Sequence, residues 1–333
     1  MARFESFSSP HARLIRRQFE FVTPALLVDW VVVLALSALA RHFESRYPYA
    51  RPIEPYLGDP AYGYPVEDEQ FPSGPGSVLD VVTWYAPLGV IAVVAAARRS
   101  FHDLHHGVLG LTASRAVMRT VVEFLKVQVG RFRPSFFARC DYDTIEKICR
   151  GPYHLVKDGR KSFPSGHSST SWQALFFVAL FLAGKNGAFA LSAPYPRSTP
   201  FQSRLLRLSI CIVPLFLAAY VCLTRIQDHW HHPTDVMAGS LIGVTSSLLV
   251  YSIYYRNPFH VGSSSSSTTP REPGTTVREQ RERDEVEMAE RLHELGNPKD
   301  VYGALERKRE GEIALGDDDD ADTVAAAEEG RAV

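Results

Sequence analysis

The stretch LDVVTWYAPLGVIAVVAAA, residues 79–97, contains one charged residue, Asp80, and is followed directly by Arg98 and Arg99. A predominantly apolar run of about 17 to 25 residues is long enough to cross the hydrocarbon core of a bilayer as an α-helix. A basic pair at the end of such a helix is typical of its cytosolic side. This stretch therefore predicts a membrane-spanning segment.

Similar apolar runs occur throughout the first three quarters of the chain. The six runs are residues 23–41, 79–97, 107–125, 168–185, 207–224 and 236–255. Gly, Ser and Pro inside several of them are compatible with membrane helices, where small side chains allow close packing. A soluble helical protein is the alternative, but few runs show the polar face that a water-exposed helix needs. We expect an all-α fold, a six-helix transmembrane bundle over residues 23–255.

Lys and Arg gather in alternate connecting segments, which sets the expected orientation of the bundle. They precede the first run, follow the second and lie between the fourth and fifth: Arg3, Arg13, Arg16, Arg17, Arg98, Arg99, Lys185, Arg197, Arg204 and Arg207. These segments, and both ends of the chain, are expected to face the cytosol. Residues 42–78, 126–167 and 225–235 are then expected on the opposite, lumenal or extracellular side.

The two ends of the chain differ in character from the apolar region. Residues 1–22 form a short cytosolic segment; with the run that follows, ending in Ala38-Leu39-Ala40, they also resemble a cleavable signal peptide, although Asp29 interrupts that run. Residues 256–333 combine a Ser/Thr run with mixed charges, which predicts a disordered cytosolic tail. Within this tail, 277–295 could form a short surface helix or a contact with an unidentified partner.

Composition excludes several classes of protein. The 36 Lys and Arg balance 37 Asp and Glu, so no global charge favours nucleic acid as a partner. Four cysteines without CxxC spacing do not suggest a disulfide-built fold or a zinc site. Cys211 and Cys222 lie in an apolar run and are expected to be buried hydrophobic residues. Cys140 and Cys149 flank a polar loop on the non-cytosolic side, where a disulfide is possible and the sequence leaves it open.

The segments assigned to the non-cytosolic side contain three groups of residues suited to binding phosphate. They are Lys126 with Arg133-Pro134, the stretch Lys161 to His167, and Thr224-Arg225 with Asp228, His231 and Asp235. Taken singly, Lys126 and Arg133 could be interfacial anchors, and Pro164-Ser165-Gly166 could be only a turn. A Ser165-Gly166 turn at a helix N-terminus, however, presents free N–H groups and the positive end of the helix dipole to an anion. His167 would lie beside that anion.

His231 and Asp235 are four residues apart, so on a helix they would share a face. The carboxylate could then accept a hydrogen bond from the ring and leave the other ring nitrogen free to attack an electrophile. His229 and His232 do not have this spacing and are expected to be packing residues.

The three histidines at 229, 231 and 232 also allow a metal-binding interpretation. Lys126, Arg133 and Arg225 disfavour it, because three cations repel a divalent ion but match the charge of a phosphoryl group. We therefore expect a bound anion, no metal and no cofactor.

Together these residues resemble the signature of the phosphatidic acid phosphatase type 2 superfamily, in particular its lipid phosphate phosphatases. Lys126, six residues, then Arg133-Pro134 resembles the first block, and Pro164-Ser165-Gly166-His167 the second. The third block normally reads Ser-Arg, five residues, His, three residues, Asp. Here Thr224 replaces the Ser and keeps a hydroxyl before Arg225, His231 and Asp235. The resemblance covers roughly residues 20 to 255. Three stretches resemble the diacylglycerol pyrophosphate and phosphatidate phosphatases in particular: Phe132 to Arg139, the loop of Cys140 and Cys149, and Lys157 through His167.

The resemblance implies a two-step hydrolysis of a lipid phosphate in the bilayer. It makes His231 the nucleophile that forms a phosphohistidine, Asp235 the residue that orients it and His167 the general acid. Lys126, Arg133 and Arg225, with backbone N–H groups near Ser165 and Gly166, would stabilise the phosphoryl oxygens without magnesium.

The resemblance does not name every property of the protein. It implies a multi-pass protein of endomembranes (vacuole, endoplasmic reticulum or Golgi) or of the plasma membrane, and leaves the organelle, the preferred lipid phosphate and the oligomeric state open. A catalytically silent membrane scaffold or transporter, suggested only by the long charged tail, is the alternative function.

Overall fold

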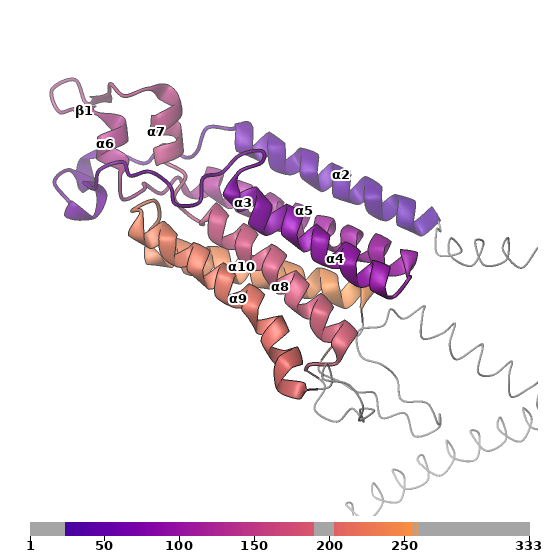
Figure 1. Ribbon diagram of the computed structural model, residues 1–333. Helices are drawn as coiled ribbons and strands as arrows, with labels where there is room; N and C mark the ends of the chain where they lie inside the picture. The colour runs from indigo at the N-terminus through magenta and orange to yellow at the C-terminus, as the bar shows by residue number, and fades with distance from the viewer. Residues whose placement is uncertain (1–23, 190–202, 256–257, 259–333) are drawn as a thin grey trace, which may run out of the picture. The chain divides into compact units, whose positions relative to one another are not determined.

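The computed structural model describes residues 24–189, 203–255 and 258. The chain divides into two compact units, 1–276 and 277–333, and all described residues belong to the first. The N-terminal segment 1–22 and, apart from residue 258, the predicted tail 256–333 with its possible helix at 277–295 lie outside the described residues. The described part of the chain is mostly helical (Figure 1).

Long helices lie at the positions of all six predicted runs. They are α2 (Pro24–Ser45), α5 (Phe101–Val129), α8 (Gly166–Asn186), α9 (Arg204–Gln227), α10 (Pro233–Tyr254), and a helix in three parts, α3 (Val78–Asp80), the π-helical η3 (Val81–Tyr85) and α4 (Ala86–Ala97). Among the described residues, four helices are long and apolar enough to cross a membrane, at Pro24–Ser45, Val78–Ala97, Arg204–Gln227 and Pro233–Tyr254. Helices α5 and α8 do not meet that criterion, so six spans remain a prediction.

Interior packing explains the polar character of α5 and α8. Gln173 on α8 is fully buried and donates through Nε2 to Ser114 Oγ on α5 at 2.7 Å. The backbone carbonyl of Gln173 accepts a hydrogen bond from Ser247 Oγ on α10 at 2.5 Å. Polar side chains that pair between helices in this way do not face lipid, since buried donors and acceptors need partners wherever water is absent.

Two glycines allow α10 to pack against the beginning of α8. A Cβ on Gly239 would lie 2.5 Å from the carbonyl oxygen of Ser165, and a Cβ on Gly243 would lie 2.4 Å from that of Ser169. Any larger residue would push the two backbones apart. At this contact, Ser165 N donates to the carbonyl of Asp235 at 3.0 Å. The second and third motif blocks are therefore held together by backbone contact.

Short elements cover one end of the long helices (Figure 1). They are η1 (Glu54–Tyr56), η2 (Pro60–Tyr62), α6 (Phe136–Cys140), the antiparallel pair β1 (Tyr142–Asp143) and β2 (Ile148–Cys149), and α7 (Tyr153–Gly159). The β-pair is a small departure from the all-α expectation. A cluster of Ile53, Phe132, Phe136 and Cys140 forms the core of this region.

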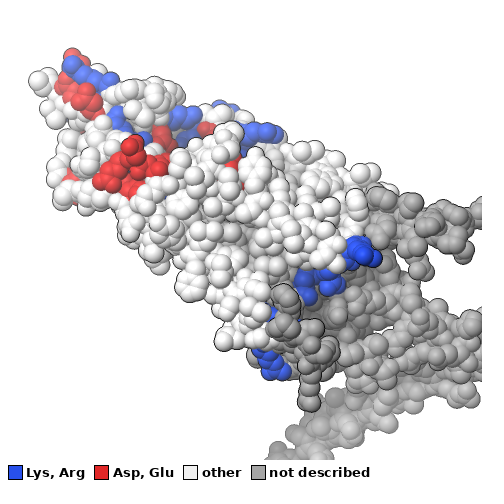
Figure 2. Space-filling view, viewed as in Figure 1, with Lys and Arg blue, Asp and Glu red and all other residues white. Residues whose placement is uncertain are grey.

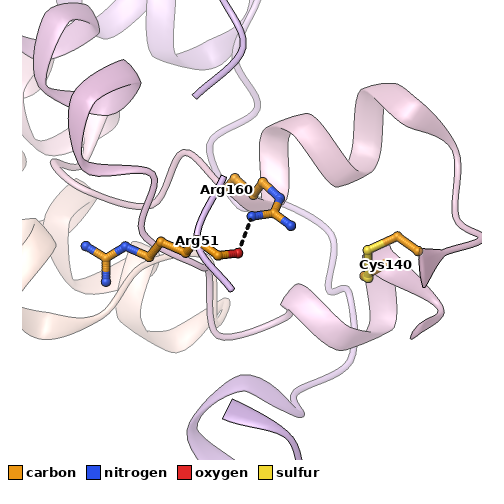
Figure 3. The surroundings of a disulfide bond; sticks show 4 residues. Arg51, Cys140 and Arg160 are labelled. Carbon is orange, nitrogen blue, oxygen red and sulfur yellow. Dashed lines mark hydrogen bonds between the residues drawn. A yellow bond between two sulfur atoms is a disulfide. The ribbon is translucent and has the colours of Figure 1, made fainter. Parts of the chain in front are cut away.

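A disulfide joins Cys140 to Cys149 across the β-pair, which resolves the pairing that the sequence left open. Near it, Arg160 NH1 donates to the carbonyl of Arg51 at 3.0 Å and ties the segment after α2 to the segment before α8 (Figure 3). Cys211 and Cys222 are free and buried, as expected from their apolar run.

Charged side chains separate along the long helices. On the face seen in Figure 2, acidic side chains gather together with several Lys and Arg at the end that carries α6 and α7, Lys and Arg alone mark the opposite end, and uncharged residues lie between. At that opposite end, Asp103 is fully buried and receives Lys185 Nζ at 2.6 Å and Arg98 Nε at 3.1 Å. The cytosolic placement of this end stays a prediction.

Candidate active site

A cavity of about 760 Å³ lies where the three motif blocks meet. The predicted site residues that line it are Lys126, Arg133, Gly166, His167 and His231. The other predicted site residues do not line the cavity and are fully buried: Ser165, Arg225 and Asp235. Segments that are far apart in the sequence therefore come together around one cavity.

His231 lies in the connection between α9 and α10, and its ring is fixed by a backbone carbonyl. Nδ1 is 2.7 Å from the carbonyl oxygen of Ser162. A carbonyl oxygen only accepts, so Nδ1 carries the proton and Nε2 keeps a lone pair. Burial, reinforced by the positive charges of Arg133, His167 and Lys126, holds the pKa of His231 well below its ordinary value of 6.5. The ring is therefore neutral at physiological pH.

Asp235 does not make the direct hydrogen bond to His231 that the four-residue spacing predicted. Its Oδ2 is 4.0 Å from Nδ1 of His231, because α10 begins only at Pro233 and His231 precedes it. Oδ2 instead accepts from the hydroxyl of Ser162 at 2.6 Å and from the backbone N of His232 at 3.1 Å. Asp235 thus reaches the ring through Ser162.

Arg131 is a second partner of Asp235 that sequence patterns did not reveal. Its NH1 donates to Asp235 Oδ1 at 2.7 Å. Arg131 and Ser162 both stand inside stretches that the motifs draw attention to, but contacts across 104 and 73 residues leave no local signal in the sequence. Both hold the Asp235 carboxylate in place.

Each predicted phosphate-binding cation is paired with a carboxylate. Lys126 Nζ donates to Glu123 Oε1 at 2.7 Å, and Arg133 NH2 donates to Asp158 Oδ1 at 2.8 Å. A buried cation needs such a partner because an isolated charge is poorly solvated in the interior. Burial opposes ionisation of Asp158, but Arg133, Arg139 and Lys126 outweigh it and lower its pKa.

Arg225 is the most deeply placed of the three cations. Its NH2 donates to Asp228 Oδ2 at 2.9 Å, and its Nε and NH2 reach the hydroxyl of Thr224 at 3.3 and 3.2 Å. Thr224 therefore supplies the hydroxyl contact for which the third motif block normally has a Ser. The replacement leaves the support of Arg225 intact.

The turn before α8 presents its helix N-terminus to the cavity. Ser165 caps the helix, its hydroxyl accepting from Ser168 N at 3.4 Å, while its own amide is used by the carbonyl of Asp235. The amides of Gly166 and His167 follow, ahead of the first internal hydrogen bonds of the helix. A Cβ at Gly166 would lie 3.1 Å from Lys126 Nζ, so glycine leaves room for that cation. The amides left available to an anion are thus those of Gly166 and His167, because that of Ser165 already donates to Asp235.

His167 enters the cavity from the first turn of α8. Its Nε2 is 2.9 Å from the carbonyl oxygen of Phe71 and 3.4 Å from Glu69 Oε2. Both partners come from the segment between α2 and α3, to which the sequence analysis gave no role.

His229 and His232, the neighbours of His231 in the sequence, pack against other residues. His229 stacks on Tyr64 with ring centroids 4.1 Å apart, and Nε2 of His232 is 3.2 Å from the carbonyl of Phe132. Within the described part of the chain, no three His, Cys, Asp or Glu side chains are grouped as a metal site requires.

Comparisons with known proteins identify the family of this chain. The PAP2 superfamily matches residues 107–259. Lipid phosphate phosphatase 2 of Arabidopsis thaliana is 34% identical over 240 residues, which cover 69% of this chain and 78% of the relative. Probable diacylglycerol pyrophosphate phosphatase 1 of Schizosaccharomyces pombe is 30% identical over 235 residues, covering 67% of this chain and 79% of the relative.

A crystal structure of a transmembrane PAP2 type phosphatidylglycerolphosphate phosphatase from Bacillus subtilis aligns with 73% of this chain and 92% of that chain, at 17% identity and a TM-score of 0.33. At that score the likeness carries no argument about the site. The sequence relatives show the family, because they extend over most of the length of both proteins. With the three motif blocks brought together around one cavity, the chain belongs to the PAP2 superfamily.

Proposed function

We propose that this protein is an integral-membrane lipid phosphate phosphatase. It hydrolyses phosphatidate, diacylglycerol pyrophosphate or a related lipid phosphate monoester through a phosphohistidine and without magnesium. Membership of the PAP2 superfamily and the names of both relatives support a phosphatase. The observation that carries the proposal is a neutral histidine of defined tautomer in a cavity lined by Lys126, Arg133 and His167.

The first chemical step uses the lone pair on Nε2 of His231. It attacks phosphorus, the bond from phosphorus to the lipid oxygen breaks, and His167 gives a proton to that oxygen. Nδ1 remains hydrogen-bonded to the Ser162 carbonyl, and the Asp235 carboxylate 4.0 Å away offsets the positive charge that develops on the ring. A phosphohistidine and a neutral diacylglycerol result.

The second step returns the enzyme to its starting state. Water attacks phosphorus, His167 takes a proton from it, and the bond to Nε2 breaks to release inorganic phosphate. Lys126, Arg133 and Arg225, with the Gly166 and His167 amides, stabilise the negative oxygens in both steps. These fixed cations supply the charge that a divalent ion would otherwise provide, which is why we propose activity without magnesium.

The cavity wall supports a lipid substrate. Besides charged residues it includes apolar side chains of α3, η3 and α5, namely Leu79, Trp84, Tyr85, Met118 and Val122. An acyl-glycerol group can lie against these apolar side chains while its phosphate reaches His231. The site would then open to the lumen or the extracellular side, with both termini cytosolic, in an endomembrane or the plasma membrane.

Replacing His231 with Ala tests the nucleophile. The variant should release no phosphate from phosphatidate in detergent micelles with EDTA present. When the wild type is incubated briefly with ³²P-labelled phosphatidate and quenched without acid, the protein should carry ³²P, and acid treatment should remove this label. Activity of His231→Ala above about a tenth of wild type would exclude this residue as nucleophile, since general nucleophilic catalysis contributes far more than tenfold. Lack of hydrolysis across a panel of lipid phosphates would instead favour a silent scaffold.

A further inference from the structure

The segment between α2 and α3 contributes Glu69 to the cavity wall, although the family match begins only at residue 107. Neighbouring residues hold this segment in place. Gln70 donates from its backbone N and from Nε2 to the Asp228 carboxylate at 3.0 and 2.6 Å. Trp230 Nε1 donates to the carbonyl of Glu67 at 3.0 Å. Contacts on both sides of Glu69 therefore fix its backbone against the site.

Glu69 meets two groups that we expect to handle the phosphate. Its Oε2 lies 3.4 Å from Nε2 of His167 and 3.5 Å from NH1 of Arg225, and its side chain is 12% exposed. Burial opposes its ionisation, but the contact with His167 and the charges of Arg225 and Arg133 outweigh burial and lower the pKa of Glu69. The side chain is a carboxylate at neutral pH.

The hydrogen bonds of His167 show what a carboxylate does there. Its Nε2 is 2.9 Å from the carbonyl of Phe71, which only accepts, so this nitrogen carries a proton. Nδ1 is then the nitrogen available to the substrate, and it carries a second proton only when the ring is an imidazolium. A buried imidazolium close to the positive charge of Arg225 is unfavourable unless an anion is in contact with it.

We propose that Glu69 is a positioning residue that favours the doubly protonated form of His167, so that Nδ1 of His167 can donate to the leaving oxygen of the substrate. This inference rests on the proposed function. In the step it supports, phosphorus bonds to Nε2 of His231, the bond from phosphorus to the lipid oxygen breaks, and its electron pair stays on that oxygen. The oxygen then takes the proton from His167.

Charged groups face His167 from several elements. Burial and the positive charge of Arg225 on α9 oppose a second proton on the ring and lower the pKa of His167 below its ordinary value of 6.5, whereas the contacts with Glu69 and with the Phe71 carbonyl raise it. Lys126 from the end of α5 and the neutral His231 from the connection before α10 line the same cavity. The carboxylate of Asp228 accepts hydrogen bonds from Arg225 and Gln70. Glu69 is the carboxylate in contact with the ring itself.

The proposed substrates provide a matched test, because they differ in their leaving group. Phosphatidate must release an alkoxide, which needs a proton, whereas diacylglycerol pyrophosphate releases a phosphate oxygen that leaves without one. Glu69→Gln should lower kcat for phosphatidate about 10- to 100-fold, within the range that general acid catalysis contributes, and lower kcat for the pyrophosphate by less than about threefold. The alkaline limb of the phosphatidate pH profile should move to lower pH.

Two variants separate this role from a structural one. Glu67→Gln removes a carboxylate from the same segment, where it contacts His229 Nδ1 at 3.2 Å and is 42% exposed, and should leave both substrates within about twofold of wild type. Glu69→Asp restores the charge at shorter reach and should recover part of the phosphatidate rate while leaving the pyrophosphate rate unchanged.

Three results would overturn the inference. Equal losses on both substrates would mean that Glu69 only shapes the site. An unchanged kcat with a lower KM and tighter inhibition by inorganic phosphate would mean that Glu69 competes with the anion for Arg225. No hydrolysis of either lipid by the wild-type protein would remove the proposed function itself, and this inference with it.

Discussion

Replacing Ser162 with Ala tests whether Asp235 acts on His231 through Ser162. The hydroxyl of Ser162 donates to Asp235 Oδ2 at 2.6 Å, and the carbonyl of the same residue accepts from Nδ1 of His231 at 2.7 Å. Ser162 and Asp235 are fully buried and His231 is 3% exposed, so water does not substitute readily for the lost hydroxyl. The substitution keeps the backbone carbonyl of residue 162 but removes the hydrogen bond that ties this residue to Asp235.

The size of the effect follows from the kind of hydrogen bond. A hydrogen bond to a charged group contributes about 1.5 to 3 kcal/mol. Asp235 keeps its contacts with Arg131 and the His232 amide, so the carboxylate stays paired and the loss falls mainly on the position of residue 162. At about 1.4 kcal/mol per tenfold change in rate, kcat should fall roughly 10- to 150-fold.

The assay is phosphate release from phosphatidate in detergent micelles at saturating substrate. Ser162→Ala, Asp235→Asn and the double variant form a cycle. If Asp235 works through Ser162, the double variant should lose little more than Asp235→Asn alone. Ser171→Ala is the matched control, because Ser171 is also fully buried on the described part of α8 but its hydroxyl makes no hydrogen bond to the described residues. It should retain wild-type kcat.

A different outcome would refute this reasoning. If Ser162→Ala stayed within about twofold of wild type while Asp235→Asn lost more than about a hundredfold, the carboxylate would have to reach the ring directly during catalysis. Full multiplication of the two single losses in the double variant would likewise show independent roles.

Three further predictions concern other parts of the structure. Because burial and nearby cations lower the pKa of His231, the nucleophile loses its lone pair only in acid, so the acid limb of kcat/KM should lie well below pH 6.5, which a pH–rate profile measures. Opening the Cys140–Cys149 bridge, which spans 9 residues, by replacing both with Ser should cost about 2 to 3 kcal/mol of unfolding free energy, seen as a lower Tm, while an unchanged Tm would exclude a stabilising role. Gly239→Ala should lower activity at least about tenfold, because its Cβ would lie 2.5 Å from a carbonyl oxygen before α8, whereas Gly89→Ala meets nothing within 4 Å and should be silent in the same assay.

The positions of the long helices could be predicted because the signal is local. From residue 24 on, the predicted run 23–41 lies within Pro24–Ser45, and the run 79–97 lies within Val78–Ala97. The apolar runs did not reveal that polar residues of α5 and α8 form hydrogen bonds with one another and with α10. Such pairing depends on which helices become neighbours, and hydrophobic patterns carry no information about that.

The candidate site was predictable in its residue types and not in its connections. Lys126, Arg133, His167 and His231 all line the cavity, as expected of chemistry that needs cations and two imidazoles around one phosphate. The prediction of a direct hydrogen bond between His231 and Asp235 was wrong, because it assumed helical spacing for His231, which precedes the helix.

The amino-acid sequence by itself determined that apolar helices form, where they lie, which chemistry the polar blocks support, and the family. Only the tertiary structure decided that Ser162 links Asp235 to His231, that Asp158 and Asp228 hold the arginines, and that Glu69 reaches His167. The physical reason is range. Helix formation and residue chemistry are properties of a few neighbouring positions, whereas a hydrogen bond between residues some 70 to 160 positions apart depends on how the whole chain packs.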